Sequence, residues 1–240
     1  MVMLGCLVVS LEGFVAIRPY NIDSTILGQL YPSKDCRGII MSEQTEELER
    51  LSQEALSSDE KLKELIESLS GPSRRERQTA AAALALVAQT DISRVVPYHA
   101  ELVDALNRPE SQTRWECLDI LTLIVPEDSR VCDKALPGAE TALFDEKNGP
   151  VRLAAMRFMC KLGATTEARS ERIWPFIDEG IQCYHGDLEY QDMLSAVVEF
   201  SQGKLSDEVK KQLANRVQFD SENGRGWLKR KSQAILDNVK

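Results

Sequence analysis

The sequence predicts an all-α protein, a right-handed α–α superhelix of about five helix pairs. Three observations lead to this prediction. One helical pattern recurs about every 38 residues, aromatic residues make up 6% of the chain, and glycine or proline stands at nearly every expected helix boundary. Runs of β-branched residues are also rare, so a sheet-rich fold fits poorly.

The pattern is clearest in residues 150–162, which read PVRLAAMRFMCKL. The apolar residues recur at three- and four-residue steps and so share one helix face: Val151, Ala155, Met156, Met159 and Leu162. The same pattern lies 38 residues upstream, where Arg114 takes the place of Arg152, and 38 residues downstream, where Tyr190 takes it. Recurrence at this period is typical of helical-repeat proteins, which are more often binding scaffolds than catalysts.

Five helix pairs are expected between residues 59 and 240. Their ranges are 59–69 with 74–88, 96–107 with 111–125, 135–144 with 150–162, 173–184 with 188–200, and 207–219 with about 226–239. We expect Pro126 to follow the end of its helix, Pro137 and Pro175 to lie in first helical turns, and Gly163 to end its helix in a left-handed conformation. Each pair buries its apolar stripe against its neighbours, so the second helices line an inner, concave surface.

The first 40 residues lack the repeat pattern. Residues 1–17 are apolar, but Glu12 interrupts them and no basic residue precedes them, which is unlike a signal peptide or a membrane span of about 20 apolar residues. We interpret residues 1–40 as over-extended translation or a disordered segment, with Met41 as the initiator; an anchor or signal is the alternative. Residues 41–58 then form an N-terminal capping helix, and residues 59–240 form the repeat domain. A native peptide spanning residues 34–50, found by mass spectrometry, would contradict this interpretation.

Composition and the lack of catalytic motifs narrow the classes of function that the chain can have. The formal net charge of −9 repels phosphate backbones on average and disfavours nucleic acid as a partner. The six cysteines contain no CxxC pair, and neither histidine has a second histidine at helical spacing. We therefore expect reduced, mostly buried thiols in a cytoplasmic protein, with no metal and no cofactor. The chain has no GxSxG, P-loop, Rossmann or HExxH motif, so we expect no enzyme activity.

The second helices of the pairs resemble HEAT repeats. In that family the second helix often follows an acidic or turn residue and begins with Val-Arg, then an alanine three residues on, then leucines. The residues that carry the resemblance are Asp145, Val151, Arg152, Ala155, Met159, Leu162 and Gly163, with Thr113, Arg114, Cys117, Leu121 and Ile124 as a fair second match. The resemblance covers approximately residues 59–240 and implies a fold rather than an activity.

One arginine per repeat stands at matching depth on the inner face: Arg77, Arg114 and Arg152. Such a row of cations can grip an acidic partner strand or a phosphate backbone. Alternatively, each arginine belongs to the packing of the repeat and pairs with turn acids such as Asp145 or Glu110. We favour this second interpretation, because the family places arginine here whatever its ligand.

Other inner-face side chains suit a protein partner. Tryptophan is enriched at interface hot spots, so Trp115 is a candidate contact, although it could equally fill a gap between second helices. Arg157 takes the repeat position of Asp119, and a surface of mixed sign suits a protein better than a polyphosphate. The predicted partner-binding residues are Arg114, Trp115, Asp119, Arg152, Leu153, Arg157 and Tyr190.

The leading hypothesis is a monomeric, non-enzymatic scaffold or adaptor that holds a protein segment on its concave face. A second hypothesis comes from HEAT-like DNA glycosylases for alkylated bases, in which Trp115, Tyr190, Asp119 and Arg152 would supply the aromatic, acidic and basic groups. Such enzymes need a positive groove for duplex DNA, which the net charge of this chain disfavours. A third is a helper lyase that attaches a chromophore to another protein, and nothing in the sequence marks it.

Overall fold

The computed structural model describes the backbone of residues 34–240 and the side chains from residue 44 onward. The chain divides into two units, residues 1–44 and 45–240. The described part of the first unit is the beginning of helix α2 (Lys34–Ser57), which starts upstream of Met41. Our interpretation of residues 1–40 therefore falls mainly outside the described residues. The rest of the description concerns residues 45–240.

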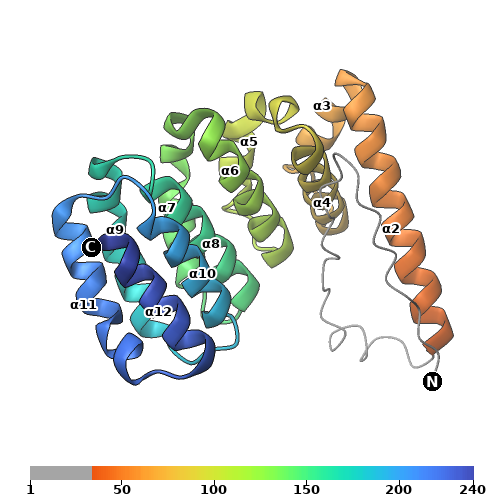
Figure 1. Ribbon diagram of the computed structural model, residues 1–240. Helices are drawn as coiled ribbons and strands as arrows, with labels where there is room; N and C mark the ends of the chain where they lie inside the picture. Colours follow the sequence, from red (N-terminus) through yellow and green to blue (C-terminus); the bar gives the residue numbers. More distant parts are fainter. Residues whose placement is uncertain (1–33) are drawn as a thin grey trace, which may run out of the picture. The chain divides into compact units, whose positions relative to one another are not determined.

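All five predicted helix pairs are present (Figure 1). They are α3 (Asp59–Ser68) with α4 (Arg74–Thr90), α5 (His99–Ala105) with α6 (Ser111–Cys132), α7 (Leu136–Leu143) with α8 (Gly149–Gly163), α9 (Glu167–Cys183) with α10 (Tyr190–Ser201), and α11 (Asp207–Asn223) with α12 (Gly226–Val239). Short 3₁₀ helices precede α5 and α7, and no strand occurs in residues 34–240. The predicted all-α helical-repeat superhelix is confirmed.

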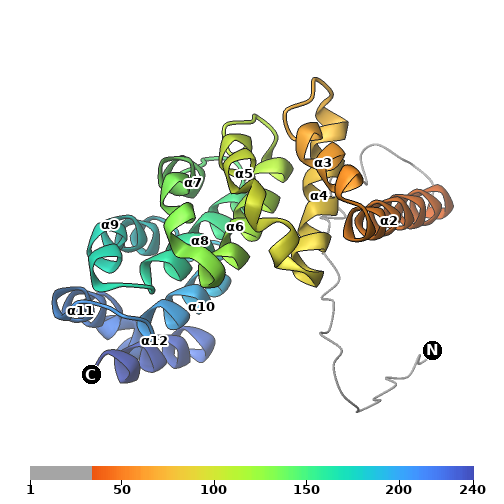
Figure 2. The same ribbon diagram turned by 90° about the horizontal axis from the view of Figure 1, so that it is seen from above.

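The second helices of neighbouring pairs pack against one another in chain order: α4 on α6, α6 on α8, α8 on α10 and α10 on α12. Among the described first helices, α9 and α11 contact each other, but much less extensively than the neighbouring second helices do. Closer approach on one side than on the other bends a stack of helix pairs. Figure 2 shows α5, α7, α9 and α11 on the outer side of this bend and the second helices on the inner side.

Helix α8 forms the centre of the apolar core, because it packs against α6, α7, α9 and α10. Its sequence turns an apolar face to each neighbour, so Met156, Phe158 and Met159 are all 0% exposed. Burying such a side chain completely contributes roughly 1.5–3 kcal/mol. The pattern that made residues 150–162 the clearest repeat in the sequence therefore reflects burial on several sides at once.

Ser and Thr residues begin four of the helices. The hydroxyl groups of Ser58, Ser73, Thr166 and Ser206 each accept a hydrogen bond from the backbone N–H three residues later, at 3.2–3.4 Å. Such a cap satisfies one of the free N–H groups of the first turn and contributes about 1 kcal/mol. The starts of α3, α4, α9 and α11 are thus set by local sequence.

Two expectations about proline were wrong. Helix α6 continues past Pro126 to Cys132 and kinks at Asp128 (φ −148°, ψ 90°), whose carboxylate accepts from the N–H of Arg130 at 3.0 Å and so starts a new turn. Pro175 lies inside α9 rather than in its first turn, because the Thr166 cap begins that helix at Glu167. Both prolines are solvent-exposed. The backbone carbonyl that lacks an N–H partner because of each proline therefore lies on the solvent side of the helix.

The expected left-handed conformation of Gly163 was also wrong. Within the described residues, positive φ is found at Gly186 and Gly226 but not at Gly163. A Cβ atom at position 163 would lie 3.0 Å from Cε2 of Phe200. Glycine therefore lets the Phe200 ring of α10 pack closely here and does not serve a backbone turn.

Candidate functional site

The inner-face arginines are held by acids of the following repeat. Arg77 forms an ion pair with Glu110 and donates to the Gly71 carbonyl at 2.7 Å. Arg114 Nη1 donates to Asp145 Oδ2 at 2.8 Å. Each acid lies just before the second helix of the next repeat, so each arginine fastens its own second helix to the next one.

Arg152 is the most fully engaged of the three. It donates through Nε to Glu189 Oε1 at 2.8 Å and through Nη1 to the Asp145 carbonyl at 2.9 Å, and its guanidinium lies 4.8 Å from the centre of the Tyr184 ring. The side chains of Arg152 and Glu189 are each 12% exposed. A Cβ atom at Gly149 would lie 3.1 Å from the Glu189 carboxylate, so this glycine makes room for the ion pair.

The pairing predicted from sequence, with Glu110 and Asp145 as acids, is thus present in the structure. Glu189 was not predicted as the partner of Arg152, although it precedes its second helix as Glu110 does. A role of Arg114 and Arg152 in contacting a partner remains a prediction. Both side chains already form ion pairs with acids of the next repeat.

Sequence reasoning missed a second set of ion pairs on the first helices. Arg169 donates to Asp133 at 2.7 Å, and Arg216 donates to Asp178 at 2.5 Å. Arg94 pairs in the same way with Asp59 at 2.9 Å. The members of each pair are 35 to 38 residues apart in the sequence, so the spacing of one repeat was the signal that could have revealed them. Arginines on both layers therefore stabilise contacts between repeats.

Low pH should weaken these ion pairs between repeats. The bonds from Arg77 hold the pKa of Glu110 below its usual value. Burial raises the pKa of Asp145, but the Asn148 amide, the Lys147 N–H and Arg114 outweigh it and lower the pKa overall. A carboxylate with a lowered folded-state pKa adds stability above its unfolded pKa, about 4.3 for Glu and 3.9 for Asp, and loses it as pH falls through the folded value.

We therefore expect Glu110→Gln to lower the free energy of unfolding at pH 7 and to have progressively less effect below about pH 4. Urea denaturation at a series of pH values measures this. Glu146→Gln, at an exposed position in the following turn, is the control and should have a small effect throughout. A Glu110→Gln cost that stays constant down to pH 2 would contradict the assigned ion pair.

Trp115 and Leu153 occupy equivalent positions on the adjacent helices α6 and α8, and both are half-buried against the core. One helical turn further along, Asp119 is half-buried on α6 and Arg157 is exposed on α8. A further turn brings Leu123, which is 41% exposed, on α6 and Lys161, also exposed, on α8. Trp115 and Leu153 thus form an apolar pair, which the other four residues follow along α6 and α8. We call these six residues the α6–α8 patch: Trp115, Asp119, Leu123, Leu153, Arg157 and Lys161.

Tyr190 does not belong to this surface. Its side chain is 1% exposed, and its ring lies 4.9 Å from the His185 ring and 6.1 Å from the Trp227 ring. The residue that takes the arginine position in α10 is therefore a core residue, covered by the α9–α10 connection and by α12. Together with the ion pair of Arg152, this means that the four residues considered for glycosylase chemistry do not meet at one surface.

Known proteins resemble this chain in fold and not in sequence. No protein-family model and no curated protein matches the sequence. Among solved structures, a designed armadillo repeat protein in complex with the peptide (KR)4 has a TM-score of 0.64 at 16% identity, over 91% of this chain and 100% of that chain. Computationally designed armadillo repeat proteins for modular peptide recognition reach 0.62 at 16% identity, over 80% and 92%. The chain has an armadillo- and HEAT-like helical-repeat fold.

A third similar structure, Kap121p bound to Pho4p, has a TM-score of 0.59 at 16% identity and covers 76% of this chain but 19% of that one. At such identities the likeness concerns the fold alone. The repeat array described here is thus a short one beside Kap121p and nearly the full length of the designed proteins.

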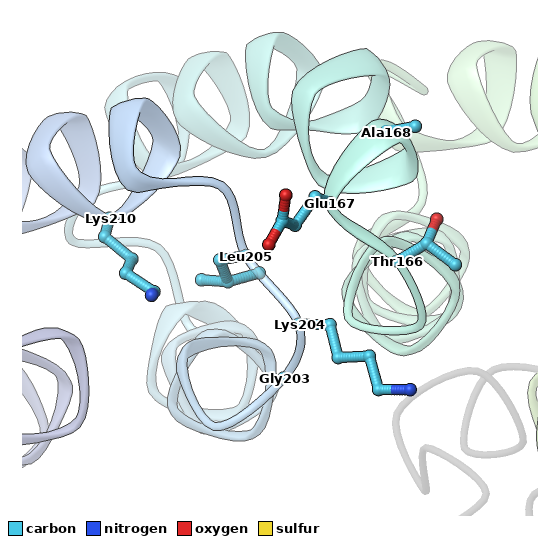
Figure 3. Close-up of a pocket in the computed structure, with 7 residues that line it drawn as sticks. All are labelled: Thr166, Glu167, Ala168, Gly203, Lys204, Leu205 and Lys210. Carbon is cyan, nitrogen blue, oxygen red and sulfur yellow. The ribbon is translucent and has the colours of Figure 1, made fainter.

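Outside the α6–α8 patch, the described part of the repeat array has a shallow pocket but no candidate metal site or membrane-spanning helix. A shallow depression of about 600 Å³ lies between the start of α9 and the α10–α11 connection, with Glu167, Lys204, Leu205 and Lys210 along it (Figure 3). No group of three His, Cys, Asp or Glu residues in the described part of the chain is placed to hold a metal ion. Across residues 34–240, none of the helices is long and apolar enough to cross a membrane.

Proposed function

We propose that this protein is a non-enzymatic scaffold that binds a segment of another protein along the inner face of its second helices. We further propose that it acts as a monomer in the cytoplasm. The observation that carries the proposal is the α6–α8 patch, in which half-buried Trp115 and Leu153 stand one helical turn from the charged residues Asp119 and Arg157. The peptides named for similar designed repeat proteins support it.

The geometry of stacked helices suits an extended segment. Packed helices lie about 8–10 Å apart, and an extended chain advances about 3.3 Å per residue. A segment that crosses α6 and α8 therefore meets a new helix about every three residues. Trp115 and Leu153 would hold an apolar side chain of that segment, and Asp119 and Arg157 would contact its polar residues. Arg114 and Arg152 would keep the two helices in register beneath it.

Trp115→Ala is expected to weaken binding by about 2 kcal/mol, or roughly 30-fold in Kd, because a half-buried tryptophan at the centre of a patch is the usual hot-spot residue. A random-peptide display library selected on the wild-type protein supplies the probe, and isothermal titration of the best peptide measures Kd. Phe219→Ala, which removes a 72%-exposed ring on α11, is the matched control and should leave Kd unchanged.

Two results would overturn the proposal. One is a library from which no peptide is enriched. The other is a Trp115→Ala variant that keeps its helical circular dichroism and binds within twofold of wild type. A gel-shift at low salt with duplex DNA carrying alkylated bases separates the scaffold from the glycosylase hypothesis, and we expect no shifted band because of the net charge of −9.

A further inference from the structure

Two cations on α8 differ from the three braced arginines of the second helices. Arg157 and Lys161 are exposed and lie one helical turn apart. Arg77, Arg114 and Arg152 are each bound to an acid, whereas within residues 44–240 neither Arg157 nor Lys161 lies in an ion pair. The bracing role of the buried arginines therefore does not account for these two.

On the side of α6 the two cations face a mixed surface, in which Asp119 takes the position equivalent to Arg157 and apolar residues lie one helical turn before and after it. Leu153 lies one turn before Arg157 on the same helix, and Trp115 stands at the equivalent position on α6. Leu123, 41% exposed, takes on α6 the position that Lys161 takes on α8. A ligand group placed against Arg157 and Lys161 would thus have exposed or half-buried hydrophobic surface beside it.

The pattern changes at the next second helix. The positions of α10 equivalent to Leu153 and Arg157 are Gln191 and Ser195. Lys231 of α12 reaches over both, because its Nζ donates to the Gln191 carbonyl at 2.8 Å and to the Ser195 hydroxyl. The apolar pair Trp115 and Leu153 and the exposed cations Arg157 and Lys161 therefore have no counterpart on α10, and Lys231 adds a third cation beyond them.

We propose that the segment bound by this protein is acidic, with one or two carboxylates against Arg157 and Lys161 and a large apolar side chain against Trp115 and Leu153. This inference rests on the proposed peptide-binding function and specifies its ligand. Two neighbouring cations beside apolar surface match a carboxylate next to a leucine or a phenylalanine. A nucleic acid needs a longer run of cations than Arg157 and Lys161 offer in a chain with a formal net charge of −9.

The test uses three fluorescein-labelled peptides of equal length that share their leucines and carry Glu, Gln or Lys at the remaining positions. Fluorescence anisotropy with the full chain should show about tenfold tighter binding of the Glu peptide than of the Gln peptide, with the advantage shrinking as salt is raised. The double variant Arg157→Glu/Lys161→Glu should abolish that advantage and favour the Lys peptide. Lys134→Glu/Lys211→Glu is the matched control, because it changes the same charge at exposed lysines outside the second helices, and should preserve the advantage.

The outcomes separate this inference from the function on which it rests. Equal binding of the three peptides, or tighter binding of the Lys peptide by the wild type, overturns the acidic ligand and leaves peptide binding intact. Loss of the Glu preference in the control double variant also overturns it, since a general effect of net charge would then explain the result. Binding of no peptide, together with no enrichment from the library, overturns both. A single-stranded oligonucleotide that binds more tightly than the Glu peptide overturns the acidic polypeptide as the ligand.

Discussion

Replacing Phe158 with alanine is expected to lower the free energy of unfolding by about 3–5 kcal/mol, the usual cost of removing a fully buried phenylalanine. Phe158 is 0% exposed and lies in α8, which packs against four other helices. The cavity would therefore open in the middle of the array. In a repeat protein each pair is stabilised mainly by its neighbours, so weakening the central pair uncouples the pairs on either side.

Urea denaturation followed by circular dichroism measures this loss. Phe219→Ala deletes the same side chain at a position that is 72% exposed and should change the free energy of unfolding by no more than about 0.5 kcal/mol. We expect the Phe158 variant to show a broader transition or a second one, because the two halves of the array then unfold less cooperatively. A Phe158→Ala cost as small as that of Phe219→Ala would show that the core is not centred on α8.

The helix pairs could be predicted because their signals are local. The recurrence around Arg114 and Arg152 marks the second helices, and the Ser58 hydroxyl caps α3 within its own first turn. Proline was the weaker guide. Its cost depends on whether the missing hydrogen bond faces water or the core, and the exposure of Pro126 and Pro175 is a property of the folded array that spacing alone does not reveal.

The candidate site was predictable only in part, for a related reason. The sequence placed Arg114 with Asp145 because the arginine recurs with the repeat and an acid lies in the turn before the next second helix, although the acids themselves do not keep the 38-residue spacing. It failed for Tyr190, because the residues that cover this ring, His185 and Trp227, come from the α9–α10 connection and from α12. The register predicts which positions are equivalent. Whether an equivalent position is exposed depends on loops and terminal helices that do not repeat.

Arg152→Met is expected to destabilise the protein by about 2–4 kcal/mol. The change removes bonds to Glu189 and to the Asp145 carbonyl together with the contact to the Tyr184 ring. It also leaves the Glu189 carboxylate, which is 12% exposed, without its cation, and an unpaired charge in such a place is costly. Met keeps much of the apolar length of the arginine side chain, so the loss measures the polar bonds more than the packing.

A double-mutant cycle with Glu189→Gln distinguishes bracing from ligand binding. If Arg152 chiefly fastens α8 to α10, the two single variants should be coupled by at least about 1 kcal/mol in the free energy of unfolding, and the double variant should be less destabilised than the sum of the single ones. The exposed pair Arg50 and Glu54 gives the reference cycle, with coupling below about 0.5 kcal/mol. Coupling near zero for Arg152 and Glu189, combined with loss of peptide binding in Arg152→Met, would instead assign this arginine to the partner. The inner face would then offer a third cation on α8, and the acidic segment would extend across that helix toward its start.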